Sequence, residues 1–127
     1  GACGNTCNFR AEDGANFNLL LAELRKQLKA LGKTTKRDYE LSIAISANPS
    51  LIDKLPLADM VKPLDFVNVM TYDYHLASEP LTGFHSPLKP SSLDPNPSAG
   101  TLNTEYALEY VRGAGVKARM INLGLPF

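Results

Sequence analysis

Three stretches of the chain, residues 39–47, 65–75 and 117–127, alternate between aliphatic and small, polar or polarisable side chains. A period of two is the pattern of a β-strand whose two faces have different surroundings. We therefore predict three strands. Each would pack its aliphatic face on helices, while the other face would look toward an interior that can hold a ligand, as in a parallel sheet or barrel.

The second of these strands ends in an unusual cluster of reactive side chains. Val67, Val69 and Thr71 alternate with Asn68, Met70 and Tyr72. The apolar run then stops at a phenol, a carboxylate, a second phenol and an imidazole, namely Tyr72, Asp73, Tyr74 and His75. The pattern indicates a buried strand that delivers reactive groups to the rim of a sheet.

Apolar residues at helical spacing predict an amphipathic helix before the first strand. They are Phe17, Leu20, Leu21, Leu24, Leu28 and Leu31. Acidic residues stand near the start of this segment and lysines near its end, which complements the helix dipole. We expect the helix to end at Gly32 and to pack its apolar stripe on the sheet.

The remaining connections differ in length. Residues 51–61 have short helical patterning interrupted by proline, and residues 103–115 predict a helix that Asn103 or Thr104 can cap. Between the second strand and that helix, residues 76–101 have no pattern and are rich in proline, serine and glycine. Loops of this length inside a compact domain are usually functional or mobile.

The order of strand, helix, strand, long loop, helix and strand predicts a parallel β/α architecture. By pattern alone, a small doubly wound sheet fits as well as a segment of a barrel. A closed eight-stranded barrel needs about 250 residues, so 127 residues can form only part of one. No phosphate-binding glycine loop is present, which disfavours a nucleotide-binding sheet.

Composition excludes several classes of function. Lys plus Arg and Asp plus Glu both number 13, so the charge gives no indication of a nucleic-acid or membrane partner. No apolar run of about 20 residues is present to span a membrane.

Cys3 and Cys7 lie in a Gly- and Asn-rich segment without histidine, which disfavours zinc. A small disulfide ring is sterically allowed there, and free thiols are the alternative.

The segment Met70-Thr71-Tyr72-Asp73 resembles the sixth-strand motif Met-x-Tyr-Asp of the glycoside hydrolase family 18 chitinases. Residues 83–88 resemble the loop after that strand, residues 123–127 the seventh strand and residues 39–47 the fifth. The resemblance covers nearly the whole chain in order. It implies an α/β fold, a partial (β/α)8 TIM-barrel segment with about three parallel strands and flanking helices. Residues 1–127 would be a segment of one catalytic barrel domain, incomplete at both ends.

The resemblance also implies a chemistry for the rim cluster. Family 18 enzymes cleave with retention, and the acetamido oxygen of the substrate itself is the nucleophile. Tyr72 would donate a hydrogen bond to that acetamide, Asp73 would orient the sugar, and Met70 would line an apolar floor. Tyr74 would either stack on a sugar or pack the loop.

No cofactor or metal is implied. We assign surface or loop-bracing roles to His75 and His85, which lack the spacing and carboxylate partners of a metal or relay site.

The acidic fourth-strand signature of the family, Asp-x-x-Asp-x-Asp-x-Glu, is absent, and its last residue is the general acid. The expected parent is a secreted chitinase acting on chitin or N-acetylglucosamine oligosaccharides, with no nucleic acid or membrane partner. The segment alone would be inactive, because it needs the remainder of the barrel. Secretion would favour a Cys3 to Cys7 disulfide. A non-catalytic chitinase-like lectin is the main alternative, and an unrelated small α/β binding module is the third.

Overall fold

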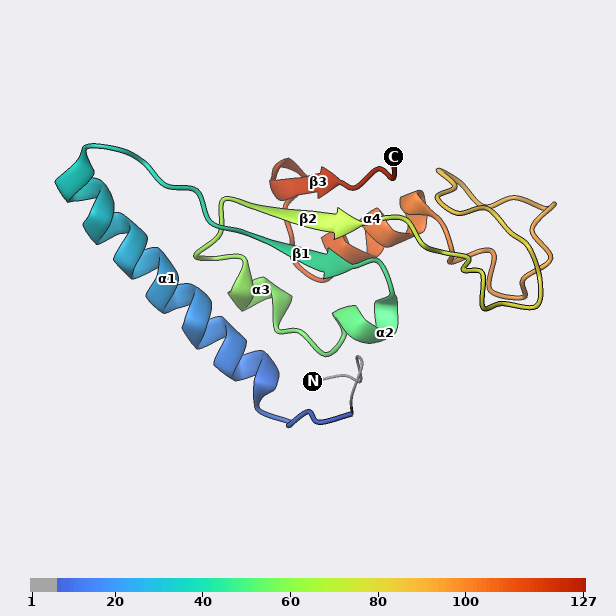
Figure 1. Cartoon of the computed structure of the whole chain (residues 1–127), viewed down its shortest axis with the longest axis horizontal. Coiled ribbons are helices and arrows are strands. Elements are labelled where there is room, and N and C mark those ends of the chain that lie inside the picture. Colours follow the sequence, from blue (N-terminus) through green and yellow to red (C-terminus); the bar gives the residue numbers. More distant parts are fainter. Residues whose placement is uncertain (1–6) are drawn as a thin grey trace.

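The structure is a computed structural model and describes residues 7–127. The predicted order of elements is confirmed (Figure 1). The helices and strands are α1 (Asp13–Thr35), β1 (Ser42–Ser46), α2 (Pro49–Ile52), α3 (Leu57–Met60), β2 (Phe66–Met70), α4 (Thr104–Gly113), the 3₁₀ turn η1 (Ala118–Met120) and β3 (Ile121–Leu123).

The three strands form one open sheet in the order β1-β2-β3, and both pairs are parallel. Val67 in the central strand lies opposite Ile43 on one side and Ile121 on the other. Because all three strands run the same way, their carboxyl ends share one edge of the sheet. The long loop that follows β2 extends beyond that edge in Figure 1.

The aliphatic face of the sheet forms the core, as predicted. Ile43, Ile45, Val67 and Val69 are buried, and α4 packs Ala107 and Val111 into the same cluster. On the other face Ser42, Ala44 and Met70 are exposed. The alternation of the sequence therefore separated the packed face from the open face correctly.

The first helix is confirmed, but the prediction that Gly32 ends it is wrong. α1 continues to Thr35, and Lys36 is its left-handed C-cap, with φ 59° and an N–H that donates to the Gly32 carbonyl. The chain folds back over the helix at this point. A Cβ atom on residue 32 would lie 2.5 Å from the Arg37 carbonyl oxygen, so the glycine is needed for a close approach and not for a stop.

The expected packing of the α1 stripe on the sheet is also wrong. Of its six residues only Leu21 is buried, in the same core cluster as the strands, and the main contact of α1 with another element is with α3. α1 is held at the amino ends of the strands by Arg25, whose guanidinium donates to the carbonyls of Pro63 and Tyr39 and pairs with the Asp65 carboxylate. This anchor sits at one point along the helix, so most of the stripe remains exposed.

The third strand is shorter than predicted. η1 occupies its first part and only three residues pair with β2. Leu123 and Leu125, which belong to the aliphatic face predicted for this strand to pack on helices, are both exposed, because β3 is the last regular element of the described chain. The Cys3 to Cys7 pairing involves Cys3, which lies outside the described residues, and it stays a prediction.

Candidate active site at the carboxyl edge of the sheet

The rim after β2 is tied to two other segments through Thr71. This residue is fully buried, and its hydroxyl donates to the Gly124 carbonyl at 2.7 Å. In turn the Ser86 hydroxyl donates to the Thr71 carbonyl at 2.6 Å. The turn at Tyr72 and Asp73 is therefore held by hydrogen bonds from two sides, the segment after β3 and the long loop.

Gly124 packs directly beneath Tyr72. A Cβ atom there would lie 2.6 Å from the Val69 carbonyl oxygen and 2.8 Å from Cε1 of Tyr72. Its N–H donates to that same Val69 carbonyl at 2.9 Å. This contact could not be predicted from the sequence, since it joins residues far apart in the chain.

Asp73 has an unusual backbone. Its φ of 60° lies in the left-handed region, which aspartate tolerates better than most residues because its side chain is short and polar. The carboxylate is exposed, and its Oδ1 lies 3.2 Å from Nε2 of His85. The combination of a rare backbone conformation and a paired carboxylate is typical of functional turns.

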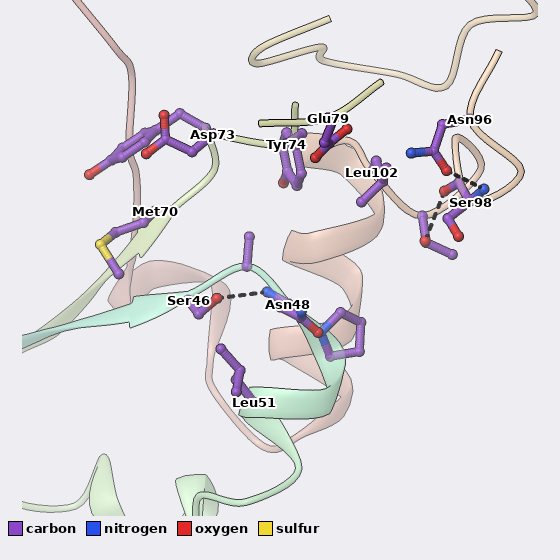
Figure 2. Close-up of a pocket in the computed structure, with 14 residues that line it drawn as sticks. Ser46, Asn48, Leu51, Met70, Asp73, Tyr74, Glu79, Asn96, Ser98 and Leu102 are labelled. Carbon is purple, nitrogen blue, oxygen red and sulfur yellow. Dashed lines mark hydrogen bonds between the residues drawn. The ribbon is translucent and has the colours of Figure 1, made fainter. Parts of the chain in front are cut away.

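A cavity of about 620 Å³ opens at this edge. Figure 2 shows its walls: the end of β1 and the start of α2 at the bottom, the β2 rim with Met70 and Asp73 on one side, and the long loop on the other. All four predicted substrate-binding residues, Met70, Tyr72, Asp73 and Tyr74, line it. The loop adds Glu79, Asn96, Ser98, Thr101 and Leu102, which sequence reasoning did not single out.

Tyr74 is a buried wall of this cavity. Its side chain is 9% exposed, and its N–H donates to the His85 carbonyl at 3.1 Å. The hydroxyl has no well-formed hydrogen bond to any described residue. Burial raises the pKa of Tyr74 to about 12, with the nearby Thr104 side chain partly opposing the rise. The phenol is therefore protonated at neutral pH, and the residue packs the loop while also facing the cavity.

His75 corrects one expectation, because it does have carboxylate partners. Nδ1 lies 2.9 Å from Oε2 of Glu79, and Nε2 lies 2.9 Å from Oδ2 of Asp94. The loop-bracing interpretation of His75 is confirmed, with a buried imidazole that lies between two carboxylates. Sequence reasoning missed it because Asp94 lies 19 residues away in a segment without pattern. His85 likewise has a carboxylate partner, Asp73.

The described residues contain no group of three or more His, Cys, Asp or Glu side chains placed to hold a metal ion. In the same part of the chain, no helix has the length and apolar character needed to cross a membrane.

The sequence is similar to that of known proteins along nearly its whole length. The model of the family described as glycosyl hydrolases family 18 matches residues 3–127. Chitinase A1 of Niallia circulans is 33% identical over 121 residues, which cover 93% of this chain and 17% of that protein. The chain thus spans less than a fifth of the length of this relative.

Solved structures agree with that similarity. The chitinase ChiA74 from Bacillus thuringiensis superposes with a TM-score of 0.91 at 30% identity, covering 99% of this chain and 20% of that one. YKL-39, solved in the presence of chitooligosaccharides, superposes with a TM-score of 0.79 at 28% identity, covering 91% of this chain and 33% of that one. The three strands and their helices are therefore an arc of a (β/α)8 barrel, as predicted.

Proposed function

The chain belongs to glycoside hydrolase family 18, and from this premise we propose that residues 1–127 form one segment of the catalytic barrel of a secreted chitinase. The parent enzyme would hydrolyse β-1,4-linked N-acetylglucosamine polymers. One observation carries the proposal: the end of β2 delivers Met70, Tyr72 and Asp73 together to a cavity at the carboxyl edge of the sheet. Active sites of barrel enzymes lie at this edge.

In the proposed mechanism the acetamido oxygen of the bound sugar attacks the anomeric carbon, and the glycosidic oxygen departs with the aglycone. The Tyr72 hydroxyl donates a hydrogen bond to the acetamido group and so places it for attack. Such a donor is effective when it is already held in place, because it then needs no reorganisation during the reaction. The close packing of Gly124 beneath the Tyr72 ring supports this role.

Asp73 and Met70 would complete the support of the reacting sugar. The left-handed turn and the His85 contact set the direction of the Asp73 carboxylate, which would hydrogen-bond the acetamide and orient it. Met70 is about one-third exposed and offers an apolar floor, and Tyr74 closes the wall. The proton for the departing oxygen would come from a carboxylic acid elsewhere in the complete barrel.

Tyr72→Phe in the full-length protein tests this assignment. We expect kcat on a chromogenic N-acetylglucosamine trimer to fall by about 10² to 10³, the effect of losing one donor at developing charge. Tyr39→Phe is the matched control, because that hydroxyl donates to Thr35 on α1, at the other end of the sheet. Turnover of the Tyr72 variant within threefold of wild type would refute the proposed role.

A chitinase-like lectin is the second candidate, and the similarity to YKL-39 supports it. Such a protein would bind N-acetylglucosamine oligosaccharides in the same cavity without cleaving them. Calorimetric titration with a tetramer, followed by chromatography of the sugar after prolonged incubation, separates the two functions. Binding with intact tetramer supports the lectin, whereas release of shorter oligomers supports the enzyme.

A further inference from the structure

The His75 side chain is enclosed between two carboxylates. It is only 4% exposed, and Asp94, its partner at Nε2, is 3% exposed. Glu79, its partner at Nδ1, is about one-third exposed. An ionised carboxylate can only accept hydrogen bonds, so both ring nitrogens must donate for both contacts to be favourable. With both carboxylates ionised, this geometry favours an imidazolium.

The long loop approaches the ring from a third side. Gly83 lies so close to the imidazole that a Cβ atom at this position would overlap it. Among the described residues, the charged groups that pair with the ring are the Glu79 and Asp94 carboxylates alone. Burial opposes protonation of the ring, but the hydrogen bonds with Asp94 and Glu79 outweigh it and raise the pKa of His75 above its ordinary value.

A chain of hydrogen bonds connects this ion cluster to the cavity wall. The second oxygen of Asp94, Oδ1, accepts from the Asn96 N–H at 2.9 Å. Asn96 Oδ1 accepts from the Ser98 N–H at 2.8 Å, and the Ser98 carbonyl accepts from the Thr101 hydroxyl at 3.0 Å. Asn96, Ser98 and Thr101 all line the cavity. Their positions therefore depend on where His75 holds Asp94.

Glu79 belongs to the same wall. Its carboxylate lines the cavity while one of its oxygens contacts His75, and Figure 2 shows it beside Tyr74 across from Asn96 and Ser98. The loop thus offers a carboxylate, an amide and hydroxyls on one surface. Groups of this kind recognise sugar hydroxyls, and they do so well only when they are held in place.

We propose that His75 is a positioning residue that holds Glu79 and Asp94, so that residues 79–101 form the sugar-binding wall of the cavity. This inference rests on the proposed function, in that the cavity takes an N-acetylglucosamine oligosaccharide. The wall is separate from the Tyr72 and Asp73 groups that act on the reacting acetamide. Loss of the His75 contacts should therefore weaken sugar binding more than it slows the chemical step.

Steady-state kinetics of the full-length protein on an N-acetylglucosamine tetramer test this split. His75→Ala should raise KM about tenfold or more, the size of a lost charge-assisted hydrogen bond, with kcat within threefold of wild type. His75→Gln keeps one donor and should recover part of the loss. Asp59→Asn, at an exposed ion pair with Lys62 in α3, is the matched control.

Asp94→Asn provides a second variant, which retains the size of the side chain and removes one charge. It should raise KM as His75→Ala does. If the His75→Ala protein does not fold, the KM of Asp94→Asn tests the positioning role instead. A KM within twofold of wild type for Asp94→Asn, or a kcat that falls as much as kcat/KM, would overturn the proposal.

The protonation of His75 gives a readout that needs no activity. Nitrogen NMR of the imidazole should show both nitrogens protonated at pH 6. Because the pKa is raised, the contribution of the cluster is complete below about pH 6.5 and is lost as the pH rises through the raised value. Amide hydrogen exchange in residues 76–101, corrected for the intrinsic pH effect, should then accelerate. A single protonated nitrogen at pH 6 would overturn the proposal.

The two hypotheses fail in different ways. If wild-type protein neither binds nor cleaves the tetramer, the proposed function is wrong, and the sugar-binding part of this inference fails with it. If wild type binds the tetramer but the His75 and Asp94 variants bind equally well, only the positioning role is wrong.

Discussion

Gly124→Ala would test how closely the β3 side of the site fixes Tyr72. The added methyl group would meet the Val69 carbonyl oxygen at 2.6 Å and Cε1 of Tyr72 at 2.8 Å, whereas ordinary contacts of this kind begin near 3.4 Å. Since Val69 is part of the central strand and fully buried, its carbonyl cannot move aside. The Tyr72 ring and the segment that carries residue 124 must therefore shift by several tenths of an ångström.

Two consequences follow for stability and activity. Overpacking of this kind costs about 1–3 kcal/mol in the free energy of unfolding. The shift would also strain the hydrogen bonds from Gly124 to Val69 and from Thr71 to Gly124. A displacement of about 1 Å in a catalytic group can cost about 10²-fold, so we expect kcat to fall about tenfold or more.

The assay is hydrolysis of the chromogenic trimer by the full-length protein, with thermal unfolding measured in parallel. Gly113→Ala is the matched control, because a Cβ atom at that position would meet nothing within 4 Å. Gly124→Ala protein with the kcat and unfolding temperature of wild type would show that Tyr72 is not held from this side.

Three further outcomes are expected. The Leu41 N–H and the Arg25 guanidinium hold the pKa of Asp65 below its ordinary value of 3.8. The ionised carboxylate therefore stabilises the fold at pH values above 3.8, and this stabilisation is lost as the pH falls through the lowered pKa. Urea unfolding should show that Asp65→Asn lowers the free energy of unfolding at pH 6, and that its difference from wild type shrinks as the pH falls below 3.8; a difference that does not depend on pH would contradict this. Tyr74→Phe should unfold at the same or a higher temperature, because it removes a buried hydroxyl without a well-formed hydrogen bond; a clear drop would contradict this. The isolated segment of residues 1–127 should release no product from the trimer, because the general acid is absent; release at the rate of a whole chitinase would refute that reasoning.

The parts of the fold that depend on local pattern were predictable. Alternation marked the packed face of each strand, and Val67 and Val69 are fully buried as expected. Helical spacing located α1 and α4, and Asn103 caps α4 by accepting from the Tyr106 N–H. The motif from Met70 to Asp73, together with Tyr74 directly after it, gave all four candidate residues, and all four line one cavity.

The parts that depend on contacts between distant segments were not predictable. Gly32 and Gly124 are required by the close approach of another stretch of chain, which neither residue's neighbours in sequence reveal. The partnership of His75 with Asp94 forms only when the loop folds back across the rim. The apolar stripe of α1 correctly indicated a helix, but a stripe alone does not say which element will cover it.

The distance along the chain between paired strands has a consequence for the order of folding. β1 and β2 pair across about two dozen residues, whereas Asn122 in β3 bonds to Asn68 across a separation of 54. Each doubling of a closed loop costs about 0.6 kcal/mol, roughly threefold in the rate of closure. We therefore expect the β1 and β2 pair to form first and β3 to dock last. Because Gly124 follows β3, the Tyr72 ring would reach its final position only at this late step. Pulsed hydrogen exchange during refolding should show the Gly124 amide protected after those of β2, and simultaneous protection would contradict this order.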